Sequence, residues 1–337
     1  MTDRSTSLEL AATAGLRYVS DEAPGSRRVR RGKGFSYVDA AGESLPEAER
    51  EWIRSLAIPP AWTDVWICPH RDGHILATGY DEAGRKQYIY HPAWEEARDE
   101  AKFERLGDFG SRLASLRRRI DSDLRRPGLE RDKVVALAVA VLDRTLIRVG
   151  NRQYAESNDS YGLTTLTREH VELNGSRVSL AFVGKGGAEH ELAFSDRRLA
   201  SLLTKCQELG GQTLFGFESE AGVGTIGSGD VNDYLADATG RPFTAKDFRT
   251  WGATSIVVGH LATCNGVETP QTHFLEAVDV AADRLGNTRQ VCRASYVHPV
   301  IEAATEDGRI AEAWRRSRSG KWLTRPESAV RRLLNVS

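Results

Sequence analysis

The sequence changes character near Pro92, and this change constrains the fold more than any other feature. From Gly34 to Tyr90, short runs rich in β-branched and aromatic residues are separated by turn signals such as Arg71-Asp-Gly73, a pattern typical of a small sheet. After Pro92, apolar residues recur at helical spacing. We therefore predict an α+β protein with a small β-rich amino-terminal domain over residues 15–92 and a larger, mainly helical domain over residues 93–304. The first helices of the second domain are expected over residues 93–106, 109–126 and 132–148.

A short β section interrupts the helical region. Two alternating arms, residues 178–182 and 189–194, are joined through Gly184-Lys-Gly-Gly187, which predicts a hairpin with Lys185 at its tip. Residues 216–229 are expected to form a loop. At the ends of the chain we expect a flexible segment over residues 1–14 and a basic helical tail over residues 305–337.

The composition is that of an ordinary globular protein. The chain has 337 residues, of which 40% are hydrophobic, enough for two domains or one large one. No apolar run approaches the ~18 residues needed to cross a bilayer, and the start lacks a signal-peptide core. We expect a cytoplasmic, nucleoid-associated protein that does not enter a membrane.

The cysteines do not indicate a disulfide framework. The four are scattered without a CxxC pair, and no second ligand pair follows Cys68, His70 and His74 at the spacing of a zinc site.

The basic residues are clustered although the formal net charge is only −1. Residues 26–33 hold five basic side chains and no acidic one, residues 117–119 are all arginine, and residues 309–337 hold eight basic against two acidic side chains. Such runs are often solvated faces, but three separate ones in a near-neutral chain favour a surface that follows a nucleic-acid backbone.

A tyrosine stands near the end of a predicted short helix. The helix with apolar Phe274, Val278, Ala281 and Leu285 should end at Gly286. Asn287 or Thr288 can cap a second short helix, which Pro299 stops, so Tyr296 lies where a side chain can be exposed and adjustable. Taken alone, such a tyrosine is usually structural.

Three cationic positions are candidates for binding phosphate. Thr244-Ala-Lys-Asp247 resembles a capping box, which places Lys246 and Arg249 on one face of the first helical turns. Arg148 ends an apolar helix before a glycine, where it could also cap backbone carbonyls.

Other motifs point elsewhere. Gly222-Val-Gly-Thr-Ile-Gly227 matches GxGxxG, with Asp247 twenty residues later, but no strand is expected before it, so a dinucleotide site is not indicated. Asp121 and Asp123 are expected to form ion pairs within an arginine-rich helix rather than to bind metal.

The order of these motifs resembles the type IB DNA topoisomerase family, specifically its small bacterial and poxviral members. The resemblance rests on IRVGN around Arg148, GLTTL at 162–166, FVGKGG around Lys185, KDFRTWGAT from Lys246, and LGNTRQVCRASYVHP around Tyr296. IPPAWTDVWICP and GRKQYIYHP resemble the amino domain of that family, so the resemblance spans residues 15–303.

The resemblance implies a role for each matching residue. Tyr296 would be the nucleophile, Arg148 and Arg249 the phosphate clamp, and Lys185 the general acid, with Lys246 supporting. A histidine usual nine residues before the tyrosine is replaced by Asn287, which can donate a hydrogen bond but adds no charge.

The same resemblance implies an activity and a partner. The enzyme would relax positive and negative supercoils in double-stranded DNA through a 3′-phosphotyrosyl intermediate, with no metal, nucleotide or other cofactor. It would act as a monomer that clamps the duplex.

Two other functions share part of this pattern. A tyrosine recombinase uses a similar Arg, Lys, Arg and Tyr set, but usually carries a histidine where Lys246 stands and has a helical rather than a β-rich first domain. A non-catalytic DNA-binding module with the same fold would have no need of the intact motif residues.

Overall fold

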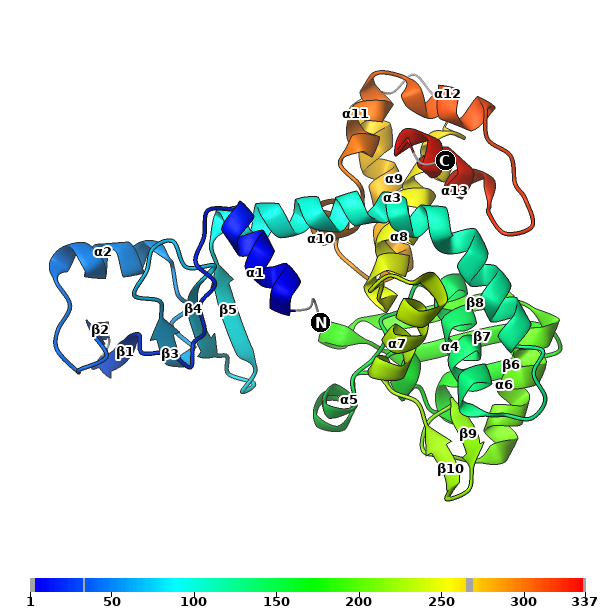
Figure 1. Ribbon diagram of the computed structural model, residues 1–337, viewed down its shortest axis with the longest axis horizontal. Helices are drawn as coiled ribbons and strands as arrows, with labels where there is room; N and C mark the ends of the chain where they lie inside the picture. Colours follow the sequence, from blue (N-terminus) through cyan, green and yellow to red (C-terminus); the bar gives the residue numbers. More distant parts are fainter. Residues whose placement is uncertain (1–3, 33, 265–268, 336–337) are drawn as a thin grey trace. The chain divides into compact units, whose positions relative to one another are not determined.

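The computed structural model describes residues 4–32, 34–264 and 269–335. By its internal contacts the chain forms two compact units, residues 1–103 and 104–337. The boundary lies within helix α3 (Pro92–Asp123), which begins at the predicted domain limit, so a division at Pro92 itself stays a prediction. The two helices expected over residues 93–126 are this one continuous helix, which runs through the expected break at residues 107–108 and ends at Asp123 (Figure 1).

The first unit is the predicted small sheet. Five antiparallel strands lie in the order β2-β1-β3-β4-β5. Ile53 of helix α2 forms the buried core of this unit with Ile58, Val65, Ile67 and Ala77. The elements are α1 (Arg4–Thr13), β1 (Ser26–Arg31), β2 (Gly34–Val38), α2 (Glu47–Ser55), β3 (Thr63–Ile67), β4 (Ile75–Tyr80) and β5 (Lys86–Tyr90).

One expectation for this unit needs correction, and one residue of the basic run has a structural role. Residues 4–13 were expected to be flexible but form helix α1, because Ala11 is buried. The basic run becomes strand β1, in which Arg28 donates to the carbonyls of Ile58, Pro59 and Trp62 and is therefore partly structural. Lys33, the last residue of that run, lies outside the described residues.

The Cys68–His74 segment has a structural explanation. His74 is buried, its ring stacks on Tyr18 at 4.2 Å, and its Nδ1 accepts from the amide of Val19. Within the described part of the chain, no group of three or more His, Cys, Asp or Glu side chains could hold a metal ion.

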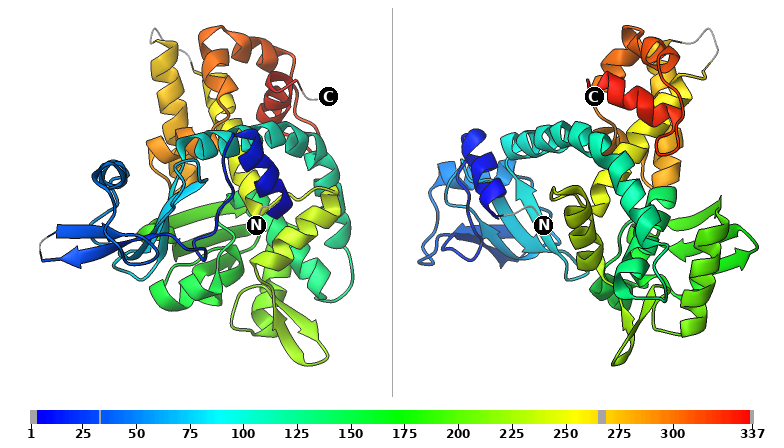
Figure 2. Two further views of the ribbon diagram at one scale, coloured as in Figure 1. Left: turned by 60° about the vertical axis from the view of Figure 1, so that its left-hand side comes forward. Right: turned by 45° about the vertical axis from the view of Figure 1, so that its right-hand side comes forward.

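The second unit is mainly helical and is built around α4 (Arg131–Thr145). This helix is buried along most of its length, as expected for its nearly continuous apolar sequence. A three-stranded antiparallel sheet and a two-stranded hairpin are the β structures of this unit that the structure describes. Figure 2 shows the hairpin β9–β10 and the carboxyl-terminal helices at opposite ends of the unit. The other elements are α5 (Arg152–Asn158), β6 (Val171–Asn174), β7 (Arg177–Val183), β8 (Glu189–Ser195), α6 (Arg197–Leu209), β9 (Gly216–Ser219), β10 (Gly222–Thr225), α7 (Ser228–Thr239), α8 (Ala245–Leu261), α9 (Pro270–Leu285), α10 (Arg289–Tyr296), α11 (Val300–Glu306), α12 (Arg309–Arg315) and α13 (Arg325–Leu333).

Several sequence predictions for this unit are confirmed, but the loop expected after α6 is not. The hairpin β7–β8 carries Lys185 in its turn, and Asp123 forms the expected ion pair within α3, with Arg119. Asp121 pairs with Arg125, just beyond the end of α3, and with Arg198 on α6. The loop expected over residues 216–229 is instead the antiparallel hairpin β9–β10 followed by α7. GxGxxG therefore starts on a hairpin strand, which still differs from the βαβ context of a dinucleotide site.

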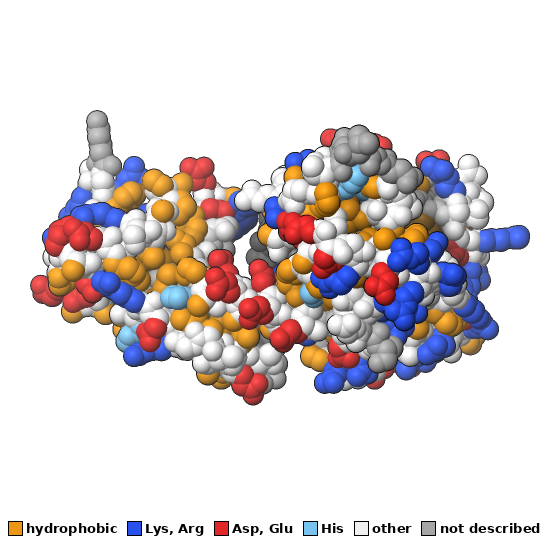
Figure 3. Space-filling model, turned by 90° about the horizontal axis from the view of Figure 1, so that it is seen from above, with side chains coloured by type: hydrophobic (Ala, Val, Ile, Leu, Met, Phe, Trp, Pro, Cys, Tyr) orange, Lys and Arg blue, Asp and Glu red, His pale blue; other side chains and the backbone are white. Residues whose placement is uncertain are grey.

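The carboxyl-terminal segment is helical, as predicted, but it packs into the core instead of forming a tail. Ile310, Ala313, Ala329, Val330 and Leu333 are buried in the main hydrophobic cluster. Most of the basic side chains of this segment are exposed. Figure 3 shows Lys and Arg side chains gathered on one face of the second unit. The last two residues of the predicted tail lie outside the described residues. In the described chain, no helix has the length and apolar character required to span a membrane.

Candidate active site

A cavity of about 320 Å³ in the second unit brings together five of the six predicted site residues. Arg148, Lys185, Lys246, Arg249 and Tyr296 all line it, although they come from four separate segments of the chain. The sixth, Asn287, is not a lining residue but contacts one of them. Among the described residues that line the cavity there is no carboxylate, so all the charged side chains of its wall are cationic.

Arg148 is held by backbone packing after the end of α4. The helix was expected to reach residue 148, but it ends at Thr145 because Leu146 adopts a left-handed conformation (φ 59°). The amide of Leu163 then donates to the carbonyl of Arg148 at 2.8 Å. Gly162 permits this approach, since a Cβ there would lie 2.6 Å from the same carbonyl oxygen. The GLTTL motif therefore fixes the backbone that carries Arg148.

Arg249 connects two helix ends. It lies in the second turn of α8, whose start is stabilised by the predicted capping interaction between Thr244 and Asp247. Arg249 is 3% exposed. Its Nη1 donates to the carbonyl of Leu146 at 2.5 Å, and its Nη2 donates to the carbonyl of Leu285 at 3.0 Å. These bonds hold the guanidinium 5.0 Å from the ring centroid of Tyr296.

Asn287 faces Arg148. Helix α9 ends at Gly286 in a left-handed conformation, as predicted, and Thr288 rather than Asn287 caps α10 by accepting from the amide of Val291. The side chain of Asn287 is thereby available, and its Oδ1 accepts from Arg148 Nη2 at 2.6 Å. Of the two candidates for the cap, Thr288 is the one used.

Three donors at this site are buried without acceptors. Arg148 Nη1, Arg249 Nε and Asn287 Nδ2 have no hydrogen-bond partner among the described residues. A buried donor left unpaired costs about 1–3 kcal/mol, so such a group of donors is rare in a folded protein without a functional reason. An anion with several acceptor oxygens would satisfy them.

The cations make Tyr296 more acidic than an ordinary tyrosine. Burial raises the pKa of its phenol, but the positive charges of Arg249, Arg148 and Lys246 outweigh burial, and the net pKa lies below the usual value. The site therefore favours the phenolate, which is the nucleophilic form of tyrosine.

His190 is a residue of this region that the sequence did not reveal. It is buried on β8, where a Cβ on Gly184 would lie 2.7 Å from its ring and one on Gly286 would lie 2.3 Å from it. Burial and the charges of Arg148 and Arg249 lower its pKa, so the imidazole is neutral. His190 thus separates the Lys185 turn from the loop of Asn287. The place of a histidine in the alternating sequence of a strand does not indicate that it lies beside an active site.

Two protein-family models match the chain. The catalytic core of eukaryotic DNA topoisomerase I matches residues 91–315, and the amino-terminal domain of bacterial DNA topoisomerase IB matches residues 34–81. The matches cover strands β2, β3 and β4 of the first unit and the segments that carry all six site residues.

Curated viral proteins are similar over most of their length. DNA topoisomerase 1B of Acanthamoeba polyphaga mimivirus is 30% identical over 274 residues, which cover 78% of this chain and 81% of the relative. DNA topoisomerase 1B of vaccinia virus (strain Copenhagen) is 22% identical, with 76% and 82% covered, and DNA topoisomerase 1 of rabbit fibroma virus (strain Kasza) is 23% identical, with 77% and 83% covered. The predicted α+β fold agrees with these matches, and the chain belongs to the type IB DNA topoisomerases, a family of isomerase enzymes.

Proposed function

We propose that this enzyme relaxes positive and negative supercoils in double-stranded DNA by cutting and resealing one strand through a 3′-phosphotyrosyl intermediate at Tyr296. The observation that carries the proposal is the cavity in which a tyrosine with a lowered pKa meets four cations and adjoins three buried, unpaired donors. A phosphodiester is the DNA group whose charge and oxygens suit this arrangement.

The nucleophile needs the surrounding charge. A phenol of pKa ~10 is about one part in a thousand ionised at pH 7, a penalty near ~4 kcal/mol. Arg249, Arg148 and Lys246 reduce this penalty because each stabilises the phenolate. The same cations stay in place when the negative charge moves onto the phosphate oxygens.

The two arginines and Asn287 would stabilise the transition state. Arg249 already uses Nη1 and Nη2 on backbone carbonyls, so Nε is its donor for a non-bridging oxygen. Arg148 Nη1 and Asn287 Nδ2 would serve the other oxygens. Donors fixed before the reaction stabilise developing charge without a reorganisation cost.

Lys185 is the proposed general acid. It lies on an exposed turn between Gly184 and Gly186, which is left-handed (φ 78°), so the ammonium can approach the scissile phosphate when DNA is bound. Protonation of the leaving 5′-oxygen by a positioned group typically contributes ~10²- to 10⁴-fold. Lys246, which lines the same cavity, is the alternative donor.

The proposed reaction needs no ATP. Attack by Tyr296 replaces one phosphodiester by another, and the 5′-hydroxyl reverses the step, so no bond energy is lost. The side chains above supply the charge stabilisation that a metal supplies elsewhere. We further propose that a monomer clamps the duplex and acts in the cytoplasm on nucleoid DNA. A sedimentation experiment that finds one protomer bound to each short duplex would support the monomeric state.

Plasmid relaxation tests the proposal directly. Negatively and positively supercoiled plasmids are incubated with the enzyme in EDTA without nucleotide, and both are expected to relax at moderate salt. Tyr296→Phe should abolish relaxation and covalent capture of DNA while leaving DNA binding intact. Absence of relaxation by the unchanged enzyme at every salt concentration would contradict the proposal.

A further inference from the structure

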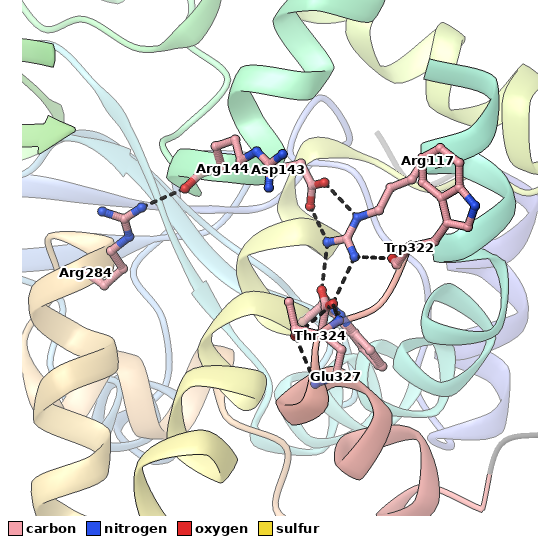
Figure 4. A network of polar contacts seen from close by, with 8 residues as sticks. Arg117, Asp143, Arg144, Arg284, Trp322, Thr324 and Glu327 are labelled. Atoms are coloured by element: carbon pink, nitrogen blue, oxygen red, sulfur yellow. Dashed lines mark hydrogen bonds and ion pairs between the residues drawn. The ribbon is translucent and has the colours of Figure 1, made fainter. Parts of the chain in front are cut away.

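A buried ion network lies among the helices that hold the site. Arg117 on α3 donates Nε and Nη2 to Asp143 at 2.8 and 2.7 Å, and donates Nη1 and Nη2 to Glu327 at 2.9 and 2.7 Å (Figure 4). Its Nη1 also donates to the carbonyl of Trp322 at 2.7 Å. One guanidinium therefore joins α3 and α4 to the carboxyl-terminal segment.

Glu327 extends the network to α8. It is buried, and its Oε1 accepts from Trp251 Nε1 at 3.3 Å, while its Oε2 accepts from the amide of Thr324 at 2.7 Å. Trp251 stands two residues after Arg249. The carboxylate of Glu327 therefore fixes the start of α13 and contacts the helix that carries Lys246 and Arg249.

The network and the active site use the same helix ends. Asp143 lies two residues before the end of α4, and the carbonyl of Leu146 beyond that end accepts from Arg249. At the end of α9, Arg284 donates to the carbonyl of Arg144 at 2.6 Å, and the next residue, Leu285, accepts from Arg249. If a change in the network displaced α4, α8 or α9, Arg249 would therefore move with it.

A shared cavity brings the two sets of residues face to face. A hollow of about 500 Å³ is lined by Arg117 and Glu327 on one part of its wall and by Leu146, Phe248 and Gly252 on another. Phe248 directly precedes Arg249. The network and the neighbours of Arg249 therefore line one hollow, and polar contacts of the network add to the close packing of Gly252 on Leu146.

We propose that Glu327 is a positioning residue for catalysis, and that helix α13 is thereby part of the catalytic apparatus. The proposal rests on the proposed function. Glu327 lies beyond residues 91–315, the stretch that the catalytic-core family model matches. Through Trp251 and Arg117 it sets the spacing of α8 and α4, and thus the placement of Arg249 against Tyr296.

The charges suit a positioning role better than a stabilising one. Burial raises the pKa of Glu327, but the hydrogen bonds and charge of Arg117 outweigh it, so the carboxylate stays ionised. A buried ion pair gives little net stability relative to apolar packing, whereas the loss of one partner leaves an unpaired charge. The hydrogen bonds of Arg117 and Glu327 instead hold the connected helices in a fixed geometry.

Glu327→Gln tests the proposal with little change of volume. The amide oxygen can replace only one of the two carboxylate oxygens, so Gln keeps an acceptor for either Trp251 or Thr324, and it cannot neutralise Arg117. We expect single-turnover cleavage of a suicide duplex to slow ~10- to 100-fold, as small misplacements of reacting groups do, with the Kd for the duplex changed less than about twofold. The pH at which cleavage reaches its plateau should rise, because Tyr296 loses part of the influence of Arg249.

A matched control and a second variant complete the experiment. Glu312→Gln, on the neighbouring helix α12 and in an exposed pair with Arg316, should cleave like the unchanged enzyme. Trp251→Phe removes the indole donor to Glu327 and should shift the pH profile in the same direction even if Glu327→Gln folds poorly. All rates are measured below the melting temperature of each variant.

The possible outcomes separate the two proposals. An unchanged rate and pH profile in Glu327→Gln would overturn the positioning role, as would a loss of cleavage that only follows the unfolded fraction or the loss of DNA binding. If the unchanged enzyme itself forms no covalent adduct with DNA, the proposed function fails, independently of Glu327.

Discussion

Asn287 Oδ1 accepts a hydrogen bond from Arg148 Nη2 at 2.6 Å, while the Nδ2 of the same amide is buried without a partner among the described residues. One end of this amide orients the arginine, and the other end is available to a phosphate oxygen. A histidine at this position could supply a donor with a charge, whereas asparagine supplies a neutral donor whose direction is fixed by Arg148.

Asn287→Ala should therefore slow cleavage ~10²-fold or more, since the loss of one donor to developing charge costs about that much. Asn287→Asp should be slower still, because its carboxylate would pair with Arg148 and repel the phosphate. Single-turnover cleavage measures both. Gln290→Ala, an exposed change one turn along α10, is the control. An Asp variant as fast as the unchanged enzyme would contradict a phosphate contact at this position.

Lys185→Ala should show a defect that depends on the leaving group. Cleavage of ordinary DNA is expected to slow by ~10²- to 10⁴-fold, but a substrate with sulfur in place of the 5′-bridging oxygen should react at nearly the normal rate, because a thiolate leaves without a proton. The comparison of the two substrates is the measurement. If sulfur restores Lys246→Ala but not Lys185→Ala, the general acid is Lys246.

The pH dependence of cleavage should reveal the cations around Tyr296. The phenolate is the reactive form, so the rate rises with pH until the tyrosine is ionised. Lys246 lowers the pKa of Tyr296, and Lys246→Gln should therefore move the plateau of the rate to higher pH while leaving the plateau value less affected. Single-turnover rates on the sulfur substrate, which needs no general acid, measure this shift. A plateau at unchanged pH would show that Lys246 does not act on the phenol.

Local patterns predicted much of the fold. The hairpin around Lys185 has strict alternation and a glycine-rich turn, and the end of α9 has a glycine where the left-handed conformation is needed, so both were correct. The end of α4 was placed too late, because Leu146 adopts a left-handed conformation that an apolar residue seldom takes and that Arg249 stabilises from a distant helix.

Contacts distant in sequence were not predictable in the same way. Glu327 follows Thr324 as a capping box would, but nothing in the sequence pairs it with Arg117, which lies in a run that reads as a solvated basic face. The position of His190 depends on two glycines from different segments. The motif residues could be named in advance only because the family resemblance supplied their order.

Acid should weaken the second unit through His298. Burial lowers the pKa of this imidazole from 6.5 to about 4, and its Nδ1 accepts from the amide of Val300. Above pH 6.5 the ring is neutral in both states and the pH has no effect through it. Between pH 6.5 and about 4 the unfolded chain binds a proton that the folded chain does not bind, so the free energy of unfolding falls as the pH falls and levels off below about pH 4.

The loss of unfolding free energy would be roughly 3 kcal/mol for a fully buried group and about 1–2 kcal/mol after solvent screening. His298→Asn retains an acceptor for Val300 without a titrating ring, and its unfolding free energy in urea should fall by that much less between pH 7.5 and 4. The partly exposed His273→Asn serves as the control, and equal pH dependence in all three proteins would show that His298 is not the responsible group.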